Sequence, residues 1–321
     1  AGGGSDLPVW TRSGRAGQCL SLAVASYTHA VAIARPDRQV VASYRQRDVA
    51  ASATEIANGL IRESALLHGW EDGFEVHTLS ELSSRGSGLG VSSSIAVALA
   101  ACFQRMATLR LGLKTDPRWQ DGGELGFRTN VARDAWTVEI DRLRRPIGRQ
   151  DHMAAVHGGL RLYRFEHNDA TIDREFSKED ATWLASHLAL VELSEGHDAR
   201  TILSRVTDSA MLAASVEAIP MAVKAIEVRS SLRLGQALQH CQKSKMAIPG
   251  AVPPWLAKIV DDIQSCPGIM GCKVAGAGAG GHVVVVLEKP NDVPRAIENL
   301  LGLKTIPVVA DLAGVRSDAW L

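Results

Sequence analysis

The most informative part of the sequence reads Leu82-Ser-Ser-Arg-Gly86-Ser-Gly88-Leu-Gly90-Val-Ser92-Ser-Ser-Ile-Ala-Val-Ala-Leu-Ala-Ala-Cys102-Phe103. Glycine stands at every second position from Gly86 to Gly90, and without a Cβ the backbone there can turn tightly and approach a ligand closely. Three serines suited to a helix cap or first turn follow, and the alanine-rich apolar run behind them is typical of a buried helix. Because such a loop brings free N–H groups and the positive end of the helix dipole to one point, it predicts a phosphate-binding site. The alternative is a turn whose glycines only start the helix.

Two widespread phosphate loops do not match this stretch. The Gly-Lys-Ser/Thr ending of a Walker loop is absent, and Ser93 stands where a dinucleotide fingerprint has its third glycine. The segment from Gly88 to Ser93 instead resembles the second motif of the GHMP kinases, small-molecule kinases whose ATP loop reads Gly-Leu-Gly-x-Ser-Ser. The resemblance implies that eight residues of this stretch bind ATP: Gly86, Ser87, Gly88, Leu89, Gly90, Val91, Ser92 and Ser93.

The composition is that of a globular protein, with 46% hydrophobic and 22% charged residues. Its 321 residues are enough for two domains of ordinary size. Lys and Arg together number 35, as do Asp and Glu, so no bulk charge draws the chain to nucleic acid or to an anionic membrane. The apolar runs look too short to span a membrane, no signal peptide is recognised, and five scattered cysteines favour reduced thiols. We therefore expect a cytoplasmic protein with no nucleic-acid or membrane partner.

A second informative segment reads Ala1-Gly-Gly-Gly-Ser5-Asp6-Leu7-Pro8. On local grounds it is equally consistent with a tail or with the remnant of a purification tag. It also resembles the Ala-Gly-Gly-Gly-Thr/Ser-Asp-Leu motif of GHMP sugar kinases in the heptose-phosphate kinase and fucokinase branch. That resemblance implies a sugar-binding role for Gly3, Gly4, Ser5 and Asp6. In the family the motif follows a strand that carries a basic residue, which in this numbering would precede Ala1.

A third segment reads Pro146-Ile-Gly148-Arg-Gln150-Asp151-His152-Met-Ala-Ala-Val-His157-Gly158-Gly159. It resembles the family's Gly-Lys-Gln-Asp-Gln-Tyr-Ala-Ala-x-x-Gly-Gly segment, and Asp151 falls on the active-site aspartate. Glu139 lies twelve residues earlier, about the family's separation between the magnesium-binding glutamate and that aspartate. The resemblance implies that Asp151 is catalytic and contacts the substrate, and that Ser92 and Glu139 bind Mg²⁺. Taken singly, Asp151 would be read as a helix cap and Glu139 as a solvated helix residue.

The last glycine-rich segment reads Gly276-Ala-Gly278-Ala279-Gly280-Gly281-His282 and leads into a run of valines. As a bare string it fits the dinucleotide pattern, but a β-branched run follows it where that pattern needs a helix. It resembles the third GHMP motif, Lys-x-x-Gly-Ala-Gly-Gly-Gly-Gly, with Ala279 in place of one glycine. The resemblance implies that Gly276 and Gly278 bind ATP and that Gly278 also contacts the substrate. Ala279 is expected to have a backbone angle that tolerates a Cβ.

Hydrophobic periodicity and turn residues predict the elements between these motifs. The expected strands cover 39–44 (the returning strand of a hairpin), 74–79, 187–193 and 304–309, with a further hairpin formed by 159–165 and 170–176. The expected helices cover 54–70, 124–143, 198–218 and 222–245, the last two separated by Pro220.

The motifs occur in the family's order along nearly the whole chain. The resemblance implies an α+β, two-domain GHMP kinase fold, with an N-terminal domain at 1–180 and a ferredoxin-like C-terminal domain at 181–321. The implied activity is ATP- and Mg²⁺-dependent phosphorylation of the anomeric hydroxyl of a sugar or sugar phosphate, D-glycero-D-manno-heptose 7-phosphate above others. A homodimer is the oligomer considered. The alternatives are an L-fucokinase-like or other sugar 1-kinase, a nucleotide-binding regulator without catalysis, and a nicotinamide-dependent oxidoreductase.

Overall fold

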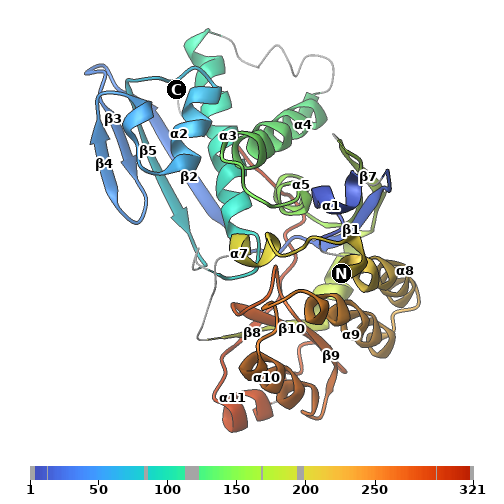
Figure 1. Ribbon diagram of the computed structural model, residues 1–321. Helices are drawn as coiled ribbons and strands as arrows, with labels where there is room; N and C mark the ends of the chain where they lie inside the picture. Colours follow the sequence, from blue (N-terminus) through green and yellow to red (C-terminus); the bar gives the residue numbers. More distant parts are fainter. Residues whose placement is uncertain are drawn as a thin grey trace.

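The computed structural model describes residues 4–12, 14–82, 86–112, 123–167, 169–193, 199–293 and 295–318. Within these ranges the strands form three sheets, and helices lie between and beside the sheets (Figure 1). The α+β class is confirmed.

The first sheet has the strand order β2-β5-β3-β4, formed by Thr28–Ala34, Phe74–Ser80, Val40–Ser43 and Arg47–Ala50. The strands expected over 39–44 and 74–79 are confirmed as β3 and β5. The hairpin expected for β3 is wrong, because β3 runs parallel to β5 and antiparallel to β4, and β5 separates it from β2.

Two helices, α2 (Gly59–Leu67) and α3 (Val91–Arg110), bury the inner face of this sheet. The fully buried side chains of Ile61, Phe74 and Phe103 belong to the shared core. The helix expected over 54–70 is shorter than predicted, because Asn58 caps α2 by accepting hydrogen bonds from the N–H groups of Leu60 and Ile61. A 3₁₀ turn, η1 (Ala53–Glu55), precedes it.

The second sheet has the order β1-β6-β7, formed by Gly17–Leu22, Leu160–Phe165 and Ala170–Glu175. The hairpin expected from 159–165 and 170–176 is thereby confirmed. The long helix expected over 124–143 is also present, as α4 (Gly123–Trp136) continued by a π-helical segment, η3 (Thr137–Arg142). The short helices α1 (Pro8–Thr11) and α5 (Gln150–His157) lie beside this sheet (Figure 1).

The third sheet is antiparallel with the order β11-β8-β10-β9, formed by Thr305–Pro307, Leu188–Glu192, His282–Leu287 and Ile269–Val274. Numbered in chain order this is 4-1-3-2, and helices separate the first strand from the second and the third from the fourth. That arrangement is the ferredoxin-like βαββαβ pattern predicted for the C-terminal half.

Successive residues of β10 point to opposite faces of the third sheet. Helices cover both faces. Val283 and Val285 share a core with α10 (Pro254–Gln264) and α11 (Arg295–Leu301). Val286 shares a core with α6 (Lys178–Ser186), α8 (Ala213–Glu227), α9 (Ser231–Ala247) and β1. This last cluster joins residues from both halves of the chain, and the division at residue 180 stays a prediction.

The helix break expected at Pro220 is wrong. Pro220 lies inside α8, and the chain turns instead at Arg229, whose φ of 51° is left-handed, before Ser230 caps α9. The segment expected as a helix over 198–218 is divided among α7 (Ala199–Leu203), the 3₁₀ turn η4 (Ser209–Leu212) and the start of α8.

Two helices, Val91–Arg110 and Ser209–Glu227, are long and apolar enough to cross a membrane by length and composition alone. This corrects the expectation that the first of them is too short. A buried core helix passes the same test, and Ala96, Leu99 and Phe103 of α3 are fully buried against the first sheet and its helices.

Candidate active site

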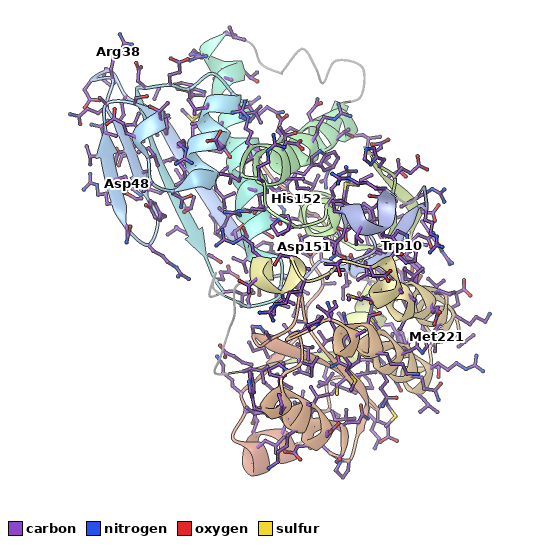
Figure 2. The ribbon with its side chains drawn as sticks, in the orientation of Figure 1. Trp10, Arg38, Asp48, Asp151, His152 and Met221 are labelled. Carbon is purple, nitrogen blue, oxygen red and sulfur yellow. The ribbon has the colours of Figure 1, made fainter. Side chains whose placement is uncertain are left out.

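A pocket of about 1110 Å³ lies where the three sheets approach one another. The glycine loop and the start of α3 line it, together with the N-terminal turn of α5 and part of the third glycine segment. Figure 2 shows Asp151 and His152 near this junction, between the upper and lower parts of the molecule. Of the residues predicted to bind ligands, Gly3 lies outside the described residues.

The glycine loop has the backbone that its sequence predicts. Gly86, Gly88 and Gly90 all have left-handed φ angles, of 65°, 71° and 72°. Gly90 is the N-cap residue of α3 and offers no side-chain cap, so the serines that follow are first-turn residues. The N–H groups at this helix end are therefore left for an anion, as a phosphate site requires.

The third glycine segment packs against the glycine loop backbone to backbone. A Cβ at Gly276 would lie 2.5 Å from the Cα of Gly88, and a Cβ at Gly281 would lie 2.0 Å from the carbonyl oxygen of Gly86. The ring Nδ1 of His282 donates a hydrogen bond of 2.7 Å to the carbonyl oxygen of Ser87, which stabilises the contact between the two segments. The glycines of this segment therefore allow two loops to interlock.

The two glycines predicted to bind ATP in this segment have different surroundings. Gly276 lines the pocket, whereas Gly278 does not and faces Ala251, whose carbonyl oxygen would lie 2.4 Å from an added Cβ. The expectation for Ala279 is wrong: its φ of 63° is left-handed, which is strained for a residue with a Cβ. Its N–H group donates to the same Ala251 carbonyl at 2.6 Å.

Glu139 is the centre of a buried polar network, the Glu139 cluster, made up of Glu139, Ser92, Ser93, Arg145 and His152. The hydroxyl of Ser92 donates to Oε1 of Glu139 at 2.6 Å. The hydroxyl of Ser93 and the Nε2 of His152 contact Oε2, each at 2.8 Å. Arg145 forms an ion pair with Oε1 and donates to the Ser92 hydroxyl.

The Glu139 cluster determines the charge of its carboxylate. Burial alone would raise the pKa of Glu139, but the hydrogen bond and charge of His152 and the charge of Arg145 lower it to about 2. Glu139 is thus an anion that remains ionised at neutral pH, with the Ser92 hydroxyl against it.

A second acidic group, the acidic pair of Asp6 and Asp151, lies on the neighbouring wall of the pocket. The carboxylate of Asp6 accepts a hydrogen bond of 2.8 Å from the N–H of Gln150, 144 residues away in the sequence. Its other oxygen, Oδ1, is buried and has no hydrogen-bond partner among the residues that the structure describes. Gly148 makes room for it, since a Cβ there would lie 1.9 Å from Oδ2.

Asp151 is the second residue of α5 and lies against the glycine loop, because a Cβ at Gly90 would be 3.0 Å from its carboxyl carbon. The residue is exposed and lines the pocket. Desolvation by the protein packed around the carboxylate, and then the negative charge of Asp6, nevertheless raise the pKa of Asp151 to about 6. Its carboxylate is therefore mostly ionised at neutral pH but close to the range in which it exchanges protons.

Part of the chain matches a protein-family model, and a curated protein is similar over most of its length. Residues 222–302 match the family model described as GHMP kinases C terminal. The D-glycero-alpha-D-manno-heptose 7-phosphate kinase of Campylobacter jejuni is 25% identical over 310 residues, which are 88% of this chain and 85% of the relative.

The crystal structure of a D-glycero-D-manno-heptose 1-phosphate kinase from Bacteroides thetaiotaomicron superposes with a TM-score of 0.70 at 17% identity, covering 98% of this chain and 94% of that one. Phosphomevalonate kinase of Streptococcus pneumoniae, solved with phosphomevalonate and AMPPNP, superposes with a TM-score of 0.62 at 14% identity, covering 88% and 89%. The chain is related to the GHMP kinases and has their fold. This relationship supports an ATP-dependent sugar kinase as its enzyme class.

Sequence reasoning missed two members of the Glu139 cluster in this GHMP kinase relative. Neither Arg145 nor His152 was assigned a role from the sequence. Their positions in the sequence could have indicated them, because Arg145 and His152 directly flank the Pro146–Asp151 segment. A fold that places this segment beside Glu139 also places these two residues there.

Lys245 on α9 is a buried cation in the same pocket. Its ammonium group donates a hydrogen bond to the carbonyl oxygen of Gly276. Burial and the charge of nearby Lys273 lower the pKa of Lys245 to about 8.

Proposed function

We propose that this protein is a kinase that transfers the γ-phosphoryl group of ATP to the anomeric hydroxyl of a sugar or sugar phosphate, with D-glycero-D-manno-heptose 7-phosphate as its substrate. One observation carries the proposal: the carboxylates of Asp6 and Asp151 lie in one pocket with a glycine loop that ends at a helix N-terminus. This juxtaposition suits a sugar hydroxyl held between an acid group and a phosphate site.

The chain supplies the positions that phosphoryl transfer requires. The N–H groups of the glycine loop and the first turn of α3 would hold the phosphates, and Asp6 would accept a hydrogen bond from a sugar hydroxyl through its unpartnered Oδ1. Asp151 would take the proton of the acceptor hydroxyl as the new P–O bond forms and the bond between the γ-phosphorus and its bridging oxygen breaks, releasing ADP. Lys245 and Arg200, which also line the pocket, are candidates to bind a phosphate already on the sugar.

The donor set near the loop fits a magnesium ion, which prefers oxygen ligands. The Glu139 carboxylate and the Ser92 hydroxyl both line the pocket, and Glu139 stays ionised. Within the described residues no cluster of three His, Cys, Asp or Glu side chains competes with this site. When bound, the ion would neutralise phosphate charge, and Ser92 and Glu139 would be its protein ligands.

A curated relative supports the choice of substrate. The heptose 7-phosphate kinase of Campylobacter jejuni supports a heptose 7-phosphate over an L-fucokinase-like or other sugar 1-kinase substrate. A small-molecule substrate, a cytoplasmic location and homodimer formation belong to the same proposal.

A coupled assay of ADP release with a panel of sugars and sugar phosphates tests this function. We expect turnover with a heptose 7-phosphate, and phosphorus NMR of the product should show an acid-labile glycosyl phosphate. A product phosphorylated only on a primary alcohol would contradict the anomeric assignment. Tight ATP binding without turnover of any sugar would favour a nucleotide-binding regulator. The oxidoreductase alternative lacks structural support, because the Gly276–Gly281 segment joins the antiparallel strands β9 and β10.

A further inference from the structure

We propose that Arg145 is a built-in cation that occupies the Glu139–Ser92 pair until a divalent ion displaces it, so that the nucleotide-free protein binds the metal weakly. The inference rests on the proposed function, because it takes Ser92 and Glu139 as the metal ligands.

The contacts of Arg145 coincide with the atoms that a metal would need. Its Nη1 forms an ion pair with Oε1 of Glu139 and donates to the Ser92 hydroxyl at 2.7 Å. These two oxygens lie 2.6 Å apart. One guanidinium nitrogen thus bridges both oxygens, and a second cation at the same place would be repelled by it.

The other oxygen of Glu139 is already satisfied. Oε2 contacts the Ser93 hydroxyl and the His152 ring, both fully or almost fully buried. Only Oε1 therefore faces an exchangeable cation. A carboxylate this deeply buried is costly without a counter-charge, and Arg145 provides one when no metal is bound.

The backbone holds Arg145 in place while leaving its side chain able to move. The helical segment η3 ends at Arg142, and Arg144, two residues later, has a left-handed φ of 54°. The N–H of Arg145 donates to the carbonyl oxygen of Glu139 at 3.0 Å. The side chain thus returns beside Glu139, yet it is 20% exposed and lines the pocket. The guanidinium can therefore leave for the pocket, where nucleotide phosphates would attract it.

Manganese binding to the nucleotide-free protein, followed by electron paramagnetic resonance, tests the proposal. The substitution Arg145→Met should raise the affinity for Mn²⁺ by about tenfold or more, because a competing positive charge is removed. The matched control is Arg142→Met, since Arg142 lies on the same helix end but pairs with Glu63 at 3.5 Å. Its Mn²⁺ affinity should equal that of the wild type.

Equal Mn²⁺ affinity in Arg145→Met and wild type, with Glu139→Gln weakening both, would overturn the role of Arg145 and leave the metal site standing. Binding of Mn²⁺ with ATP that is insensitive to Glu139→Gln would instead reject the metal site itself. If circular dichroism shows that Arg145→Met does not fold, Arg145→Gln removes the charge but keeps a donor for Ser92. The same rise in affinity is expected there, and an unchanged affinity overturns the proposal.

Discussion

Glu139 and Asp151 are carboxylates of the same pocket, but their surroundings drive their pKa values in opposite directions. Glu139 is fully buried and contacts two hydroxyls, an imidazole and a guanidinium, so its pKa falls to about 2. Asp151 is desolvated by the protein packed around it and lies beside another carboxylate, Asp6, so its pKa rises to about 6. Donors and positive charge make one group a permanent anion, while desolvation and like charge prepare the other to exchange protons.

The largest effect that this contrast predicts is on turnover. Asp151→Asn keeps the shape of the side chain but cannot accept a proton, so kcat should fall on the order of a hundredfold or more. Binding of ATP, measured by calorimetry, should be nearly unchanged, because Asp151 does not hold the phosphates in this proposal.

The matched control is Asp141→Asn, an exposed aspartate on the π-helical segment before Asp151, which should turn over normally. Near-normal turnover of Asp151→Asn would show that this residue only stabilises the start of α5. The contrast with Glu139 would then have no catalytic meaning.

Glu139→Gln should act on the metal requirement. The substitution keeps the size of the side chain but removes the charge that a hard cation needs, so the Mg²⁺ concentration for half-maximal rate should rise about tenfold or more. Steady-state rates over a range of Mg²⁺ concentrations at saturating ATP measure this effect. A lower rate with an unchanged Mg²⁺ requirement would remove Glu139 from the metal site.

The pH dependence of kcat/KM should report Asp151 and not Glu139. Because the base must be ionised, kcat/KM should decline below about pH 6, by about tenfold for each further pH unit. Asp6→Asn removes a like charge and should move this decline to lower pH. A profile that stays flat down to pH 5 would contradict the raised pKa of Asp151.

The smallest predicted effect is on folding stability. Ionisation of Asp151 destabilises the fold, whereas ionisation of Glu139 stabilises it. Asp151 has an ordinary pKa of 3.8 when unfolded and about 6 when folded, so its ionised form destabilises the fold above pH 6, and this cost is relieved as the pH falls towards 4. Asp151→Asn should therefore raise Tm at pH 7.5 and not at pH 4, by a small amount because the exposed carboxylate is screened by solvent.

Glu139 has an ordinary pKa of 4.5 and a folded pKa of about 2, so its stabilising contribution is present above pH 4.5 and is lost as the pH falls towards 2. Glu139→Gln should accordingly lower Tm at pH 7.5, with a difference that shrinks in acid. Calorimetric scans of both variants at several pH values check both signs. If both substitutions changed Tm at pH 7.5 in the same direction, the opposite pKa shifts of Glu139 and Asp151 would be refuted.

The sequence by itself determined the local parts of the site. Alternating glycines before an alanine-rich run predicted the loop and α3, and turn residues between apolar runs predicted the hairpin of β6 and β7. The spacing of Glu139 and Asp151 predicted their common location through a family resemblance. These features depend on residues close in the chain, whose periodicity and backbone freedom are visible in the sequence.

Only the tertiary structure decided what these parts contact. Pro220 stayed inside α8, and β3 paired in parallel with β5. The two glycine segments interlocked through the His282–Ser87 contact across 195 residues of sequence. The pKa of Asp151 depends on Asp6, and the charge of Glu139 on Arg145 and His152, because desolvation and Coulomb interactions depend on distances in space that sequence spacing does not encode.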